Sequence, residues 1–312
     1  MTTSTEERVR KPRKPPKIRS DTSAKVIKTV SVIVIVAFSL ACLLPFLLLL
    51  SASFTSQDYI TVHGYSLIPH DLTLEAYKLV FVVPSVIVGD YILTILLTLI
   101  GTAVGLFLMA MAGYALQRPD FTYRNVISFI VYFTTLFSGG LIPYYLMMVN
   151  TFHLKNSYLS VLLPSLMTPW LLILMKSFLK TIPHELTEAA KIDGAGDFTI
   201  FLRVIVPLAT PALATVGLFT ALGYWNGWYN ALLFLDPSYV TYQPLQFFLY
   251  RTVNSTVFLT SSMAAANISY QTLPTETLKM AVAVIATGPI VIAYPFVQKY
   301  FVQGLTVGAV KG

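Results

Sequence analysis

The sequence predicts an all-α polytopic membrane protein with six transmembrane helices. Of its 312 residues, 55% are hydrophobic and only 11% are charged, and its mean hydropathy is +0.70. So few charges could not cover the water-facing surface of a soluble domain of this length. Long apolar stretches recur along the chain, and lysine and arginine concentrate in alternate connections between them. We therefore expect the chain to lie in a lipid bilayer.

Six apolar stretches are long enough to cross a bilayer as helices. About 20 residues of helix span the hydrocarbon core, where every backbone amide must be hydrogen-bonded internally. The predicted spans are 27–51, 88–113, 126–150, 157–178, 207–234 and 277–299. They define a transmembrane domain over 27–299, between a basic, disordered N-terminal tail over 1–26 and a C-terminal tail over 300–312.

Two segments need separate interpretation. The first span follows a basic segment, as a secretory signal would, but its apolar run far exceeds the roughly 7–15 residues of a signal. It is therefore predicted to be a retained helix, in which Pro45 can introduce a kink. The stretch 252–275 is free of charge but rich in Ser, Thr, Asn and Gln, which favours an exposed loop or surface helix over a seventh span.

The distribution of basic residues predicts the orientation of the spans. With the N-terminus in the cytoplasm, 17 of the 21 lysines and arginines lie inside. Those outside are Lys78, Lys155, Arg251 and Lys279. By the positive-inside rule, both termini and the connections near residues 118 and 190 are predicted to be cytoplasmic. The basic tail precedes a membrane helix without any nucleic-acid recognition module, so it is predicted to contact lipid headgroups and not nucleic acid.

The sequence offers no catalytic or metal-binding constellation. Its four histidines show no metal-ligand spacing, and its single cysteine, Cys42, lies in an apolar run. A Walker-type glycine loop, a Gly-x-Ser-x-Gly elbow and a His-Glu-x-x-His pair are all missing from the sequence. We therefore expect a chain that is not an enzyme and that binds no metal or cofactor itself.

The cytoplasmic connection over 180–206 carries the most informative pattern. Glu185 and Glu188 suit the positive N-terminus of a short helix, which Gly194 would end. A second short helix over 198–205 would lead into the fifth span. The pattern alone is compatible both with a helix that docks into a partner's groove and with an ordinary connection at the membrane surface.

The spacing within this connection resembles the EAA loop of binding-protein-dependent ABC importer permeases. Glu188-Ala189-Ala190 is followed after three residues by Gly194, and after nine more by Val204-Ile205-Val206-Pro207. The family pattern has Ile, any residue, Leu and Pro at the last four positions, so Val204 and Val206 are conservative departures. The loop also precedes the next-to-last span, as the family requires.

The resemblance extends over most of the chain. The C-terminal segment 303–312 and the segment 63–77 are similar to the ending and the first extracellular loop of the maltose-type carbohydrate permeases. Within that group the chain most resembles the permeases that import complex oligosaccharides in Gram-positive bacteria. This implies a type I ABC importer permease fold in the bacterial cell membrane, and translocation of a carbohydrate, with an oligosaccharide expected.

The resemblance also implies partners and residue roles. The expected partners are a second homologous permease, expected to be a different chain, two ATPase subunits that bind ATP and magnesium, an extracellular solute-binding protein and the lipid bilayer. The expected ATPase-coupling residues are Glu188, Ala189, Ala190, Asp193, Gly194 and Pro207. A second contact is expected from the C-terminal tail, at Gly304, Gly308 and Lys311.

Other classes of function stay open at this point. An ABC permease for another small solute would carry the same loop. An ion-coupled secondary transporter is disfavoured, because it would need charged groups inside the membrane, whereas Asp90 and Glu276 lie near the ends of their spans. A membrane-embedded enzyme is disfavoured because convergent titratable groups are missing.

The substrate path is less clearly marked. An aromatic and amide cluster in the fifth span could stack on sugar rings and bond their hydroxyls, or could anchor the helix at the membrane interface. Its members are Tyr224, Trp225, Asn226, Trp228, Tyr229 and Asn230. In the third span, Ser138-Gly139-Gly140 could break the helix, but tight helix packing by small residues is the favoured interpretation.

Overall fold

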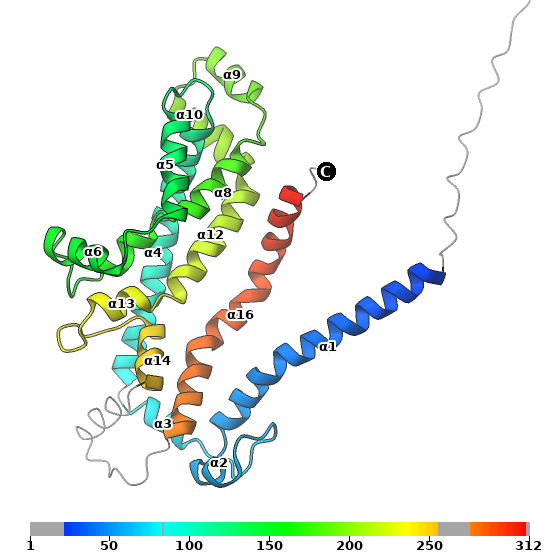
Figure 1. The fold of residues 1–312 in the computed structure, drawn as a ribbon, viewed down its shortest axis with the longest axis vertical. Helices are drawn as coiled ribbons and strands as arrows, with labels where there is room; N and C mark the ends of the chain where they lie inside the picture. The colour runs from blue at the N-terminus through cyan, green and yellow to red at the C-terminus, as the bar shows by residue number, and fades with distance from the viewer. Residues whose placement is uncertain (1–21, 83, 255–274, 310–312) are drawn as a thin grey trace, which may run out of the picture. The chain divides into compact units, whose positions relative to one another are not determined.

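The computed structural model describes residues 22–82, 84–254 and 275–309, and it divides into two units, 1–48 and 49–312. All regular secondary structure in these described residues is helical (Figure 1). The first unit consists, in its described part, of α1 (Thr22–Ser53) up to Leu48. The segment Lys25–Ser53 is long and apolar enough to cross a membrane.

The second unit contains a series of helices that vary widely in length. Those up to the middle of the chain are α2 (Gln57–His63), α3 (Glu75–Val80), α4 (Pro84–Gln117), α5 (Arg124–Leu136), α6 (Leu141–Leu146), η1 (Met147–Thr151), α7 (Leu159–Leu162), η2 (Leu163–Ser165) and α8 (Pro169–Leu179). The later ones are α9 (Glu185–Ile192), α10 (Asp197–Ile200), η3 (Phe201–Ile205), α11 (Val206–Leu208), α12 (Thr210–Trp225), α13 (Tyr229–Phe234), α14 (Leu245–Asn254) and α16 (Thr275–Ala309).

Two of the predicted spans are broken by sharp bends. The stretch 126–150 is divided between α5 and the pair α6–η1, which are bent by 115°. The stretch 207–234 is divided among α11, α12 and α13, with a bend of 84° before α12. In the described residues, three helices can cross a membrane by length and composition, or up to five if each bent pair is one span. The count of six spans stays a prediction.

The first of these breaks lies at the glycine pair after α5. Gly140 has φ +92°, a conformation that glycine adopts without the steric cost of a side chain. A Cβ added at Gly139 would meet nothing within 4 Å, and one added at Gly140 would approach only the ring of Pro143. Within the described chain these glycines pack against no neighbouring helix, unlike the favoured interpretation of the sequence; they end α5 and turn the chain.

The centre of the second unit is formed by α4, α8 and α12. The long helix α4 packs most extensively against α12 and α8. At Gly105 a Cβ would stand 2.5 Å from the carbonyl oxygen of Leu166, so only glycine allows this approach of α4 to the segment before α8. Side chains of α4, α8, η3 and α12 form one buried cluster, which includes Met109, Met175 and Val216.

At the end of α4 near Pro84, the side chains of two α4 residues cap the N-terminus of α14. Asp90 Oδ1 accepts a hydrogen bond of 2.7 Å from the backbone N–H of Gln243, and Thr94 Oγ1 accepts one of 2.9 Å from that of Leu245. Both side chains are fully buried. Asp90 and Thr94 therefore satisfy one backbone donor each at the start of a helix that lies outside the candidate spans.

The C-terminal helix is longer than the predicted sixth span. Helix α16 contains Pro289 and Pro295 and continues to Ala309, so most of the predicted tail over 300–312 has a helical backbone. Gly304 and Gly308 lie on this helix, whereas Lys311 lies outside the described residues. The same holds for the basic tail up to residue 21 and for most of the stretch 252–275.

Candidate functional site

The sequence-predicted coupling loop lies at one end of the α4–α8–α12 bundle, away from α3 and α14 (Figure 1). Its first helix, α9, begins at Glu185 directly after Pro183-His184. Glu185 and Glu188 occupy the first turn, where their charge is favourable beside the positive helix end, and Lys191 occupies the last turn.

Gly194 ends α9 through a hydrogen-bonded cap. It has φ +81°, and its N–H donates to the carbonyl of Lys191 at 3.0 Å. The N–H of Ala195 donates to the carbonyl of Ala190, also at 3.0 Å. These two bonds form the Schellman arrangement, in which a left-handed residue satisfies the last carbonyls of a helix. The predicted turn at Gly194 is therefore confirmed in its geometry.

The two sides of α9 differ in exposure. Thr187 is buried, and Ala190 packs against the central buried cluster. The opposite side exposes Ala189 and Ile192, and the Ile192 side chain is 86% exposed. Leu186, one turn before Ala190, is also exposed, whereas Ala190 faces the bundle. The exposed face of α9 is thus a small apolar patch beside Glu185 and Glu188.

The segment after Gly194 is anchored directly to the bundle. Ile200, Phe201 and Ile205 are buried in the central cluster. The Phe201 ring lies 5.7 Å from the ring of Tyr114 on α4. Helices α10 and η3 replace the single short helix predicted over 198–205, and η3 has π-helical turns. A displacement of α9 would therefore press on α4, α8 and α12.

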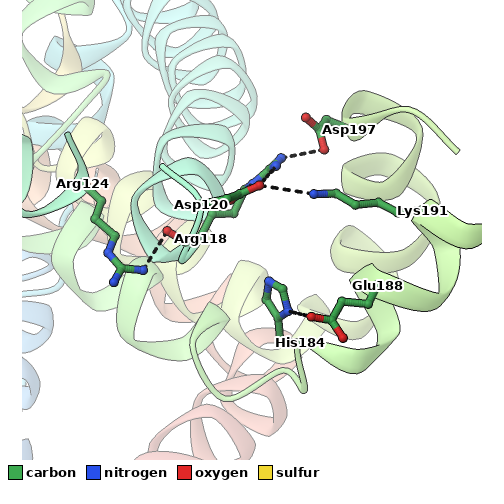
Figure 2. Close-up of polar contacts among 7 residues, drawn as sticks. All are labelled: Arg118, Asp120, Arg124, His184, Glu188, Lys191 and Asp197. Atoms are coloured by element: carbon green, nitrogen blue, oxygen red, sulfur yellow. Dashed lines mark hydrogen bonds and ion pairs between the residues drawn. The ribbon is translucent and has the colours of Figure 1, made fainter. Parts of the chain in front are cut away.

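A network of ion pairs joins α9 to the connection between α4 and α5 (Figure 2). Arg118 Nε donates to Asp120 Oδ1 at 2.8 Å, and Arg118 Nη2 pairs with Asp120 Oδ2. Lys191 Nζ on α9 lies 3.2 Å from the same Oδ2. Arg118 also pairs with Asp197 of α10, at 2.6 Å. One arginine and one aspartate thus hold both helices of the loop.

Arg124 also contacts the network, and the ion pairs shift the pKa values of Arg118 and Asp120. Arg124 Nη1 donates to the backbone carbonyl of Arg118 at 3.0 Å. The hydrogen bond from Arg118, reinforced by that from Lys191, holds the pKa of Asp120 below its usual range. The hydrogen bond to Asp120 raises the pKa of Arg118 in turn. Both groups therefore remain charged across the physiological range.

Glu188 takes part in a separate contact on the exposed side of α9. His184 Nδ1 lies 3.1 Å from Glu188 Oε1, across one turn of the helix start (Figure 2). Both side chains are at least a third exposed. Glu188 is therefore oriented by His184 and remains accessible to a partner.

The remaining predicted loop residues take different places. Asp193 is the C-terminal cap residue of α9 and is exposed. Pro207 lies in α11, and its carbonyl accepts a hydrogen bond of 2.7 Å from Thr210 Oγ1 at the bend before α12. The motif therefore begins in α9, at Glu188, and ends in α11, at Pro207, directly before α12.

The aromatic and amide cluster of the fifth span surrounds a cavity of about 240 Å³. Five of its six predicted members line the cavity: Tyr224, Asn226, Trp228, Tyr229 and Asn230. Trp225 does not, and its indole Nε1 is buried without a hydrogen-bond partner among the described residues. A substrate role for this cavity stays a prediction.

Several polar side chains around the cavity are already engaged. Tyr224 donates to the carbonyl of Leu162 at 2.7 Å, and Tyr144 donates to Asn230 Oδ1 at 3.2 Å. The Trp228 ring stacks on Tyr250 at 4.3 Å. Hydrogen bonds and ring stacking therefore hold the mainly aromatic side chains around the cavity in place.

Sequence reasoning missed the ion-pair network. Arg118 and Lys191 entered the sequence analysis only as cytoplasmic charges, and Asp120 and Asp197 did not enter it as functional candidates. Asp120 and Lys191 are 71 residues apart, so no local spacing signals their contact. No group of three or more His, Cys, Asp or Glu side chains placed to hold a metal occurs in the described part of the chain.

The chain matches a family of membrane transport components along nearly its whole length. Residues 18–307 match the model of the binding-protein-dependent transport system inner membrane component. The protein YtcP of Bacillus subtilis, called a polygalacturonan/rhamnogalacturonan transport system permease, is 39% identical over 88% of this chain and 94% of its own. Protein LplC of the same organism is 38% identical over 86% of this chain and 90% of its own.

A solved structure shows the same fold. It is a bacterial ABC transporter involved in the import of the acidic polysaccharide alginate, and one of its chains superimposes with a TM-score of 0.77. That chain is 30% identical, and the similarity covers 90% of this chain and 98% of the other. The chain therefore belongs to the binding-protein-dependent inner membrane transport components, as a permease of the sugar-transporting ABC importers.

Proposed function

We propose that this chain is the membrane permease of an ATP-driven importer that translocates an oligosaccharide delivered by an extracellular solute-binding protein. It does so together with a second permease subunit. Two ATPase subunits bind ATP and magnesium and drive the cycle, and the α9 loop transmits their closure to the membrane helices. The permease alternates between inward-open and outward-open states, whose populations ATP and the loaded binding protein shift.

The observation that carries this proposal is the double character of α9. Its outer face presents exposed apolar side chains at Ala189 and Ile192 beside two glutamates, as a docking surface would. Its inner face, through Ala190, packs on the buried cluster of the bundle. A partner that grips the outer face therefore acts on α4, α8 and α12 without a flexible segment in between.

Two substitutions test the coupling role. Glu188→Lys reverses the charge of the exposed face, and Gly194→Pro is incompatible with φ +81° and removes the N–H that caps α9. In the reconstituted complex, both variants should insert in the membrane but lose most uptake per ATP hydrolysed. Normal ligand uptake by the Gly194→Pro complex would refute the assignment.

A matched control separates coupling from folding. Gly196 lies two residues further on, has φ −72°, and a Cβ there would meet nothing within 4 Å. Gly196→Ala should therefore keep wild-type uptake. A loss of uptake equal to that of Gly194→Pro would mean that the segment is merely sensitive to any change.

The similarities also favour a class of cargo. One relative is named for polygalacturonan and rhamnogalacturonan, and the solved structure is described for alginate, an acidic polysaccharide. We therefore propose an acidic oligosaccharide as the substrate. Uptake of a labelled uronate oligosaccharide by the reconstituted complex, driven by ATP and dependent on the binding protein, tests this directly.

A further inference from the structure

A second cavity is lined by residues of and near α13 and α14. These helices lie away from α9 (Figure 1). The volume of the cavity is about 380 Å³, within the range of about 300–1,000 Å³ typical of small-molecule sites. Its wall includes Tyr145, Lys155, Phe234, Asp236, Phe247 and Arg251. Lys155 and Arg251 belong to the basic residues that the positive-inside count places outside the membrane, where a substrate arrives.

Arg251 supplies a positive charge that is held in place. Its Nη1 donates to Gln243 Oε1 at 3.0 Å, and the backbone of Gln243 is itself bound to buried Asp90. The Arg251 guanidinium carbon lies 5.9 Å from the centre of the Phe247 ring. Burial lowers the pKa of Arg251, but a guanidinium stays protonated at neutral pH. The wall of the cavity thus carries a preorganised cation.

Lys155 supplies a second cation that is accessible. Its side chain is exposed, and its ammonium group has neither a hydrogen bond nor an ion pair in the described part of the chain. The backbone beside it is fixed, because Asn156 N–H donates to the carbonyl of Phe234 and Asn156 Oδ1 accepts from Asp236 N–H, both at 2.8 Å. Lys155 is therefore held close to the cavity wall while its charge stays available.

The other groups of the wall complete a sugar-sized site. Asp236 is the acidic residue among the lining side chains, and its Oδ1 accepts from Ser238 N–H at 2.9 Å. Tyr145 stacks on Phe234, with ring centres 5.7 Å apart and planes inclined by 13°. Asp236 and Asp90 both lie close enough to offset the charge of Arg251, so the ammonium group of Lys155 is the charge that favours an anion. An aromatic face favours the C–H surface of a sugar ring.

We propose that this cavity receives an acidic sugar unit of the cargo, with Lys155 binding its carboxylate and the aromatic wall contacting its ring. The inference rests on the proposed function, which it extends to a place and to a recognition group. A neutral sugar of the same size would fit the cavity without gaining the charge-assisted hydrogen bond.

The test varies one charge and keeps the rest of the importer unchanged. The complete complex, with its binding protein, is reconstituted with wild type, Lys155→Arg, Lys155→Gln or Lys155→Glu. Uptake is measured with trigalacturonate and with its uncharged methyl ester, each relative to wild type. The same binding protein serves every variant, so its own preference cancels in that ratio. Lys78→Gln is the control, because Lys78 is also an exposed lysine on the predicted outer side.

A charge-dependent series is expected for the acidic probe only. Lys155→Gln should lower trigalacturonate uptake roughly tenfold, as expected for one lost charge-assisted hydrogen bond. Lys155→Glu should lower it further, and Lys155→Arg should stay near wild type. Uptake of the ester should change less than twofold. Stimulation of ATP hydrolysis by the loaded binding protein should persist in Lys155→Gln.

Three results would overturn the inference. One is unchanged trigalacturonate uptake in Lys155→Glu. Another is an equal fall for both probes, which would assign Lys155 to binding-protein docking or to folding. The third is a wild-type complex that moves the ester but not the acid. A wild-type complex that moves neither probe would contradict the proposed function, and this inference with it.

Discussion

Arg118→Ala is the perturbation that most sharply tests how the coupling loop is held. Arg118 is 15% exposed and reaches two carboxylates, at Asp120 and Asp197, which belong to different segments. Its removal breaks the ties of the α4–α5 connection to α10, and it leaves Asp120 with Lys191 as its cationic partner among the described residues. We expect α9 and α10 to loosen while the bundle stays folded.

The magnitude follows from the exposure of the partners. Hydrogen bonds to charged groups contribute about 1.5–3 kcal/mol when buried, and exposed ion pairs about 0.2–1 kcal/mol. The carboxylates of Asp120 and Asp197 are 49% and 59% exposed, so each tie is worth about 1 kcal/mol. The Arg118–Asp120 pair lies within the α4–α5 connection, so opening of the loop breaks only the tie to Asp197. Losing that tie lowers the free energy of local opening by about 1 kcal/mol, which corresponds to roughly fivefold more opening.

Hydrogen exchange of the purified protein measures this opening. Amides of residues 185–200 should exchange roughly fivefold faster in Arg118→Ala, whereas amides in the middle of α4 should be unchanged. Arg203→Ala is the matched control, since Arg203 is an exposed arginine of the predicted cytoplasmic connection for which the structure shows no ion pair in its described residues. Exchange of the 185–200 amides at the wild-type rate in Arg118→Ala would refute the bracing role of the network.

Two further predictions concern packing and pH. Gly105→Ala places a methyl group against the carbonyl of Leu166 and should destabilise the protein by about 1–3 kcal/mol, seen as a lower thermal midpoint, whereas Gly223→Ala meets open space and should not. Folding lowers the pKa of Asp120, so the ion pairs of Asp120 stabilise the folded state fully at any pH above the ordinary carboxyl pKa. This stabilisation is lost only as the pH falls through the lower pKa of the folded state. Exchange of the 118–124 amides, corrected for intrinsic rates, should therefore be constant from pH 5 to 8; a rise toward pH 5 would contradict the pairing of Asp120.

The class of protein and the helix–glycine turn of the 180–206 connection could be predicted from the sequence because both depend on local patterns. Apolar length and basic asymmetry are properties of consecutive residues, and the motif from Glu188 to Pro207 has a fixed spacing. Gly194 was predicted correctly because a left-handed residue after a helix strongly favours glycine.

The features that the sequence did not predict depend on contacts across the fold. The fifth predicted span is broken at Asn226-Gly227, and α12 ends there, although the apolar run continues. Asp90 was seen only as a charge near the end of a span, yet it caps α14 from 153 residues away. Composition along the chain carries no information on such pairings, and only the folded arrangement shows them.

Contact between the exposed face of α9 and the ATPase tests the central claim most directly. A photo-cross-linker is placed at Ile192, which is 86% exposed on that face, or at Ile68, which is 70% exposed in the connection between α2 and α3. In membranes that contain the complete importer, the group at Ile192 should cross-link to the ATPase subunit and the group at Ile68 should not. Cross-linking of the ATPase from Ile68, or none from Ile192, would contradict the proposed coupling.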